Sequence, residues 1–311
     1  MMNPSPNSEE RTWAVISHLS VLALGMGIPL PIVGWSDQRR KSQYAAFQCL
    51  QALGYQSLIY TFWLMALIVL LILSLVVLLL ATGAAADRVN IAAWSIILAV
   101  LAAGLFLLYL LFPLLAAVAC AFGRDYRYPI LGKRLAKHLG YGMPNDREEP
   151  SSMNEEREAQ WVAAMGHFSV IIFLWGLLAP LTSWMVQGRR NAFLKFQSIQ
   201  TTIYQIIVNI LFLVMSLIFW LGTIPVLILQ SQMGASNSNS EAVMAAFALF
   251  FVFLLIGLVM LLVLPAFHIL GEVAGYRVLK GKNYHYPIIG KLVEKRMANS
   301  DGVRAESRLT P

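Results

Sequence analysis

The chain contains two copies of one hydrophobic unit, and this duplication limits the possible folds more than any other feature. Residues 13–56 align without a gap onto residues 162–205, at an offset of 149. Both copies end with nearly the same motif, Tyr-Arg-Tyr-Pro-Ile at 126–130 and Tyr-His-Tyr-Pro-Ile at 284–288. The offset between the copies is 158 there. The extra length therefore lies in the hydrophobic middle. Matches that spread over a whole unit indicate a duplicated module.

Long uncharged runs predict that both copies lie in a membrane. Hydrophobic residues make up 58% of the chain and charged residues 13%, against roughly 25% charged residues in soluble domains. Residues 57–81, 91–122, 201–229 and 242–270 carry no charge, and each run exceeds the ~20 residues that a helix needs to cross the hydrocarbon core. The net charge of +7 is therefore loop charge, and we expect no nucleic-acid partner.

Each copy contains three hydrophobic blocks. The first, residues 13–35, is interrupted at 25–31 by two glycines and two prolines, and proline removes a helical backbone donor. The second copy keeps Gly176 and Pro180 at the matching place. Because the remaining pieces are shorter than one membrane crossing, this block predicts a broken or re-entrant helix that returns to its starting side.

The other two blocks predict long helices. The second block, 42–81 or 191–230, is too long to lie wholly in the hydrocarbon core, and its glutamine-rich first third is expected outside it. The third block carries an internal proline, Pro113 or Pro265, which predicts a kink. Cys49 and Cys120 are expected to be buried reduced thiols.

The predicted fold class is therefore an all-α integral membrane protein. It is a helical bundle of two tandem parallel repeats, each with a broken first helix and two long transmembrane helices. The predicted boundaries are a polar tail at 1–10, repeat 1 at 11–139, a charged linker at 140–157, repeat 2 at 158–296 and a disordered tail at 297–311.

Loop charge predicts the orientation. Basic clusters follow the first and third blocks in both copies, whereas the turns between blocks two and three hold almost no cations. The positive-inside rule places the basic clusters in the cytoplasm. We therefore expect a multi-pass protein of the cytoplasmic (inner) membrane with both termini and the linker inside, where the basic clusters would meet anionic headgroups.

A cysteine at Asp87, between blocks two and three, tests this orientation. We expect an Asp87→Cys variant to react with an impermeant thiol reagent that is added outside intact cells. A Ser151→Cys variant in the linker is the matched control, and it should react only after permeabilisation. An unreactive cysteine at 87 would contradict the predicted topology.

His18 and His167 occupy matching positions in the two broken helices. One interpretation is that they hold a haem or a metal between the repeats. The other is that they hydrogen-bond across helices or to backbone that the break frees. No carboxylate lies within helical reach and no metal-binding spacing is present, so we predict no cofactor.

Matched glutamines and tyrosines form a second candidate group. The glutamines share one broad helical face, which predicts either a polar surface for a partner or an interfacial helix with its wet face toward headgroups. The tyrosines stand beside cations, as in interfacial anchors or in docking sites for a cytoplasmic partner. The candidate polar or partner surface comprises His18, His167, Gln48, Gln51, Gln56, Gln197, Gln200, Gln205, Tyr126, Tyr128, Tyr284 and Tyr286.

Catalysis and ion coupling have little support in the sequence. The runs at 57–80, 91–122 and 201–229 contain no ionisable residue of the kind that marks ion or proton pathways. Walker, GxSxG, HExxH and CxxC motifs are absent from the sequence. We therefore predict that the protein is not an enzyme.

The motifs resemble a known family. Each copy has a Trp-containing opening that reaches His-Leu-Ser or His-Phe-Ser (10–20 and, more loosely, 158–169), a glycine/proline break, a basic turn, a Phe-Gln-x-x-Gln helix start and the late Tyr-x-Tyr-Pro tail. This pattern is similar to small bacterial membrane proteins of unknown function that are related to the twenty-kilodalton subunit of the Tic translocon in chloroplasts. The resemblance implies a helical bundle. The chain departs from the family in its tandem duplication. The resemblance assigns no functional site residue to this sequence.

Two functions remain open at this point. One is a non-catalytic, Tic-like scaffold or subunit of a membrane complex, whose polar helix ends bind a membrane-protein partner. The other is a conduit for a peptide, a lipid or a small neutral solute along the seam between the repeats. A conduit would place the open backbone of the broken helices on a water-filled seam, whereas a scaffold would bury it.

Overall fold

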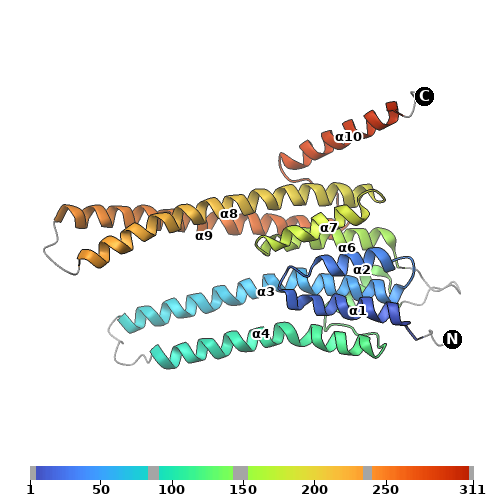
Figure 1. Cartoon of the computed structure of the whole chain (residues 1–311), viewed down its shortest axis with the longest axis horizontal. Coiled ribbons are helices and arrows are strands. Elements are labelled where there is room, and N and C mark those ends of the chain that lie inside the picture. The colour runs from blue at the N-terminus through green and yellow to red at the C-terminus, as the bar shows by residue number, and fades with distance from the viewer. Residues whose placement is uncertain (1–4, 83–90, 143–152, 234–239, 308–311) are drawn as a thin grey trace.

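The computed structural model describes residues 5–82, 91–142, 153–233 and 240–307, and these residues contain helices but no β-strand. Short helical hairpins lie beside much longer ones (Figure 1). The first half consists of α1 (Ser8–Leu19), η1 (Ser20–Ala23), α2 (Pro29–Gln38), α3 (Gln43–Thr82), α4 (Ile91–Ala121) and α5 (Leu131–Leu139). The second consists of α6 (Glu155–Phe168), η3 (Ser169–Ile171), η4 (Trp175–Leu177), α7 (Leu178–Gln187), α8 (Ala192–Met233), α9 (Ser240–Leu279) and α10 (Ile289–Ser307).

The first hydrophobic block of each half is broken where the sequence predicts. Helix α1 begins with a capping box between Asn7 and Glu10, and the chain reverses at Leu24 and Gly25, both with positive φ, before α2. Leu174 marks the matching reversal in the second half. With 12 and 10 residues, α1 and α2 are ~18 and ~15 Å long, and each is shorter than the ~30 Å hydrocarbon core.

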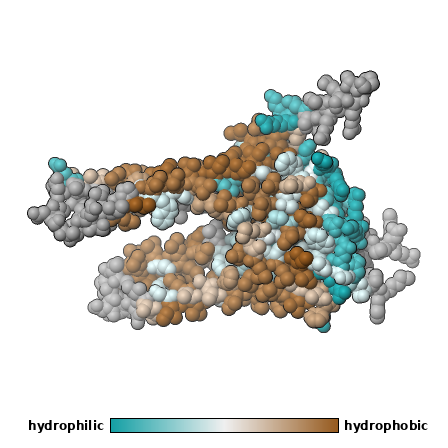
Figure 2. Space-filling model, in the orientation of Figure 1, coloured by the Kyte–Doolittle hydropathy of each residue, from teal (hydrophilic) through white to brown (hydrophobic). Residues whose placement is uncertain are grey.

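The long helices carry the apolar surface of a membrane protein. Three of them contain segments long and apolar enough to cross a membrane, namely Gln43–Leu80, Ala92–Ala121 and Ala192–Ile224 in the described part of the chain. Apolar surface covers the long hairpins, and polar surface gathers at the end where α1 and α6 begin (Figure 2). Both chain ends lie toward that polar end (Figure 1).

One hydrophobic core joins the two halves near the polar end. It includes Trp35 and Leu50 from the first half and Trp161 and Met165 from the second. Helix α2 packs against α7, and α3 packs against α6. The Trp161 ring lies over Gly54, where a Cβ atom would overlap it, so a residue without a side chain permits this close approach.

The internal prolines are not equivalent in their contacts. Pro113 has no N–H for the Tyr109 carbonyl, and the Tyr55 hydroxyl donates to that carbonyl instead, at 2.8 Å. In the second half Tyr204 donates to the matching Phe267 carbonyl at 2.7 Å. Gly271, four residues after Phe267, occupies the place that Pro113 has in the first half. Pro265 lies two residues before Phe267 and is therefore not the residue that Tyr204 compensates.

Several boundaries differ from those that the sequence predicts. Helix α10 continues to Ser307, so residues 297–307, expected as a disordered tail, are helical. The strong helix formers among them are Met297, Ala298, Arg304, Ala305 and Glu306. Helices α1 and α6 begin earlier than the predicted repeats. The turns predicted between the long helices fall largely on 83–90 and 234–239, outside the described residues. Cys49 and Cys120 are free and buried, as predicted.

Gly27 and Gly176 provide a test of the broken helices. A Cβ atom at either position would collide with a backbone carbonyl, that of Ser20 or Ser169. We expect Gly27→Ala and Gly176→Ala each to lower the free energy of unfolding by about 1–3 kcal/mol, measured by denaturation in detergent. Gly104→Ala is the control, because nothing lies within 4 Å of its added Cβ. Equal stability of all three variants would contradict this account.

Candidate functional site at the polar end of the bundle

Each half contains a buried polar cluster that links its broken helix, its first long helix and its tyrosine-rich tail. In the first half, His18 Nδ1 lies 2.8 Å from the Tyr128 hydroxyl, and His18 Nε2 lies 3.0 Å from Gln48 Oε1. Gln48 then donates to Asp125 Oδ1 at 2.8 Å and to the Tyr126 carbonyl at 3.0 Å. One histidine on α1 is thereby connected to α3 and to the segment after α4.

Gln51 completes this first cluster. Its Nε2 donates to the Tyr126 carbonyl, and its Oε1 accepts from the Tyr128 N–H, both at 3.0 Å. The Gln51 side-chain amide thus pairs with a backbone carbonyl and a backbone N–H, as a residue of a neighbouring strand would. These two bonds hold the tail in a fixed register against α3.

The second half repeats these contacts. His167 lies 3.0 Å from both Tyr286 and Gln197, and Gln200 bonds the Tyr284 carbonyl and the Tyr286 N–H at 2.7 and 3.2 Å. Asn283 replaces Asp125, and Gln197 donates to its Oδ1 at 2.7 Å. Thr201 adds a contact to His167 at 3.0 Å, where the first half has Ala52.

A third shared glutamine closes each helix break. Gln56 donates to the Ser17 carbonyl at 3.3 Å and to the Ser20 hydroxyl at 2.8 Å. Gln205 donates to the Gly166 carbonyl at 2.8 Å and to the Ser169 hydroxyl at 3.2 Å. One backbone carbonyl at each break thus accepts a hydrogen bond inside the protein. The side-chain oxygens of Gln56 and Gln205 are buried and have no partner among the described residues.

These clusters correct the predicted location of the candidate residues. All of the predicted candidates except Tyr126 are buried, so they form neither a groove open to a partner nor the wet face of an interfacial helix. The aromatic tails likewise turn inward, because Tyr128 and Tyr286 bond the histidines. The glutamine face is polar because its side chains bond other segments of the protein. Hydrogen bonding between segments was one of the two interpretations given for the histidines, and the contacts of His18 and His167 agree with it.

Burial explains the electrostatics of the histidines. Desolvation lowers the pKa of His18 and of His167 to about 4, against a smaller upward effect of the hydrogen bonds that these rings donate to Gln48 and Gln197. Both rings are therefore neutral near pH 7. Both ring nitrogens of each histidine face a hydrogen-bond partner, and this geometry does not fit a haem or metal ligand. Among the described residues no group of three or more possible ligands lies together.

A polar junction between the two halves was not predicted from the sequence. The Trp35 indole N–H donates to Glu158 Oε2 at 2.7 Å, and the Arg39 guanidinium lies 3.4 Å from the same oxygen. Burial raises the pKa of Glu158 to about 7, while Trp35 and Arg39 act in the opposite direction. Arg39 also reaches Glu155 at 3.4 Å. The sequence did contain one indication of this junction. Glu158 matches Glu9 of the first copy at the offset of 149, so both copies have a carboxylate at this position.

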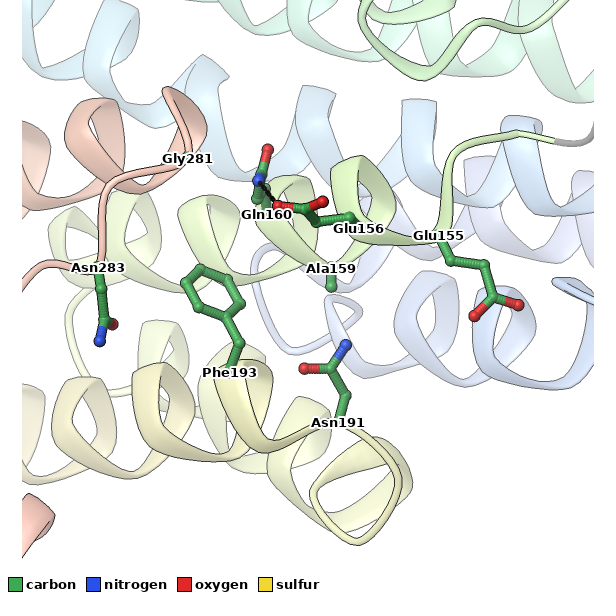
Figure 3. A pocket seen from close by; sticks show the side chains of 8 residues that line it. All are labelled: Glu155, Glu156, Ala159, Gln160, Asn191, Phe193, Gly281 and Asn283. Atoms are coloured by element: carbon green, nitrogen blue, oxygen red, sulfur yellow. Dashed lines mark hydrogen bonds between the residues drawn. The ribbon is translucent and has the colours of Figure 1, made fainter.

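Beside this junction lies a pocket of about 420 Å³. Figure 3 shows Phe193 standing in it, with Glu156 and Gln160 directed toward each other from α6. Asn283 and Asn191 also line the pocket and lie on opposite sides of Phe193 in this view. The lining mixes amides and carboxylates, and it offers polar contacts at the surface of the polar end.

Comparison with known proteins identifies the family. A family model described as the magnetosome magnetite crystal formation protein family (MamF/MmsF) matches residues 9–135 and again residues 158–293. The chain belongs to this family. No curated protein and no solved structure matches it.

The MamF/MmsF family is a family of magnetosome membrane proteins, and its double match supports a tandem duplication of a small membrane-protein unit. The predicted relation to the Tic subunit has no support in this match and stays a prediction. Both matched ranges include the histidine, the glutamines and the tyrosines of one polar cluster.

The buried histidines predict a pH-dependent stability. An unfolded histidine binds a proton near pH 6.5, but His18 and His167 do so in the folded state only near pH 4. The two histidines should therefore destabilise the folded protein as the pH falls from 6.5 to 4, by about 3 kcal/mol each. Glu158, whose pKa is raised, opposes this effect in the wild-type protein.

A double variant isolates this effect. His18→Gln with His167→Gln should be less stable at pH 7 but should show a weaker dependence between pH 6.5 and 4, measured by denaturation in detergent. His285→Gln, at an exposed histidine, is the control and should keep the wild-type dependence. An unchanged slope in the double variant would contradict neutral buried rings.

Proposed function

We propose that this protein is a non-catalytic scaffold in the magnetosome membrane that acts in magnetite crystal formation. The double match to the MamF/MmsF family supports the process. The scaffold role is supported by one structural observation, the closed state of both helix breaks. Gln56 and Gln205 each donate to one buried backbone carbonyl there, whereas a conduit would leave such carbonyls on a water-filled seam.

In this proposal the duplicated unit acts as one rigid body. Two parallel repeats dip their broken helices into the membrane, where the apolar tips of these hairpins are exposed, for example Leu24 and Met26 in the first copy and Leu174 and Trp175 in the second. The polar end faces the cytoplasm and offers a surface to a protein partner. The junction at Glu158 keeps the two units in a fixed relation.

Deletion in a magnetosome-forming host tests the process. We expect loss of the gene to change the size or the number of magnetite crystals, measured by electron microscopy, and the wild-type gene to restore them. Unchanged crystals would contradict a role in their formation.

A matched pair of variants tests the scaffold. Glu158→Ala leaves Trp35 and Arg39 without their shared buried acceptor, which should lower the free energy of unfolding by about 3 kcal/mol and impair complementation. Glu9→Ala is the control, because Glu9 is the matching residue of the first copy, is exposed, and has its partners Gln38 and Lys41 within that same copy. Normal crystals with Glu158→Ala, at wild-type protein levels and with measurably weakened stability, would contradict the need for a rigid junction.

A further inference from the structure

The outer face of α4 carries an apolar groove where the helix leaves its candidate membrane span. Leu115, Val118 and Phe122 stand on one helical face, at spacings of three and four residues, with exposed fractions of 47%, 57% and 77%. They line a groove of about 500 Å³ together with Ala119, Arg124 and Tyr126. From Leu115 to Phe122 the helix rises ~10 Å, so the groove runs along the outer part of a bilayer leaflet.

The mouth of this groove is polar and held in place. The Arg124 N–H donates to the Ala119 carbonyl at 3.0 Å, and the Tyr44 hydroxyl donates to the Arg124 carbonyl at 3.2 Å. The Tyr126 carbonyl accepts from the polar cluster. Backbone contacts thus position two side chains that remain available at the surface, a guanidinium and a phenol.

The charges around the mouth favour an anion. Arg124 is exposed and makes no ion pair within the described part of the chain. The neighbouring carboxylate of Asp125 is already engaged, by Arg127 at 3.1 Å and by Gln48 at 2.8 Å. Arg124 therefore contributes a positive charge that its neighbour does not neutralise directly.

The second copy has different side chains at the positions that line this groove, although its backbone is matched. Val118, Ala119 and Phe122 correspond to Tyr276, Arg277 and Lys280 at the offset of 158. Arg277 lies over the Tyr284 ring at 5.7 Å, and Lys280 lies over the Tyr276 ring at 4.9 Å. Charged side chains that stack on their own tyrosines occupy the place of the apolar wall. The apolar wall is therefore a property of the first copy's side chains and does not follow from the shared fold.

We propose that this groove binds one anionic phospholipid. Its phosphate contacts the Arg124 guanidinium and the Tyr126 hydroxyl, and one acyl chain lies along Leu115, Val118 and Phe122. An anionic phospholipid has a charged head next to an apolar chain. The groove has a cation at its mouth next to an apolar wall, so the two match along their length. Guanidinium–phosphate hydrogen bonds are charge-assisted and strong, and the chain adds apolar contact area.

Native mass spectrometry of the full-length protein in mild detergent tests the site. Phosphatidylglycerol, phosphatidylethanolamine and phosphatidylcholine with identical acyl chains are added separately, and the retained lipid is counted. We expect one phosphatidylglycerol to be retained in preference to the two zwitterionic lipids. Arg124→Gln should weaken that first binding about tenfold, as expected for loss of one charge-assisted contact.

Two further variants use the difference between the copies. Val118→Ser with Phe122→Gln removes the apolar wall, at two positions where the copies differ, without adding a charge. It should abolish preferential retention while circular dichroism shows unchanged helicity. Lys282→Gln, at the position matching Arg124, should leave retention unchanged. Equal binding of all three lipids, or equal loss with Arg124→Gln and Lys282→Gln, would overturn a specific site in favour of general surface attraction.

Discussion

The need to satisfy broken helix backbone away from water governs the rest of this structure. Each half interrupts its first helix, and an unpaired backbone group in apolar surroundings costs several kcal/mol. Gln56 and Gln205 supply the missing donors from the adjacent long helix. Once these amides are committed to the break, the long helix must lie directly against the short hairpin, and this contact fixes where the long hairpin leaves the core that joins the two halves.

The two polar clusters extend the same principle to the chain tails. Gln51 and Gln200 each pair with the N–H and the carbonyl of tail residues, while each histidine bonds a tyrosine of that tail. A tail that leaves a membrane helix would otherwise have no regular partner for its backbone. The polar cluster holds the backbone of the tail in one place, and it therefore also fixes the positions of Arg124 and Tyr126.

The sequence predicted the helical class, the membrane character, the break and the matching of the copies, because hydrophobic runs and proline positions act locally. It could not predict the direction in which polar side chains point. Gln48 and Gln51 give the same helical spacing whether they face headgroups or a buried partner, and their partners lie more than 70 residues away at Asp125 and Tyr126. The Glu158 junction was missed for the same reason, since Trp35 is 123 positions distant.

Duplication separates what the unit needs in order to fold from what each copy has acquired. The histidine, the glutamines and the tyrosines make the same contacts in both halves, because each break imposes the same backbone requirement. Glu9 and Glu158 match in sequence, yet only the second joins the halves. Phe122 and Lys280 match as well, but one lines an apolar groove and the other stacks on Tyr276. Matching positions with different surroundings therefore mark where the copies divide their roles, and both such places lie at the polar end.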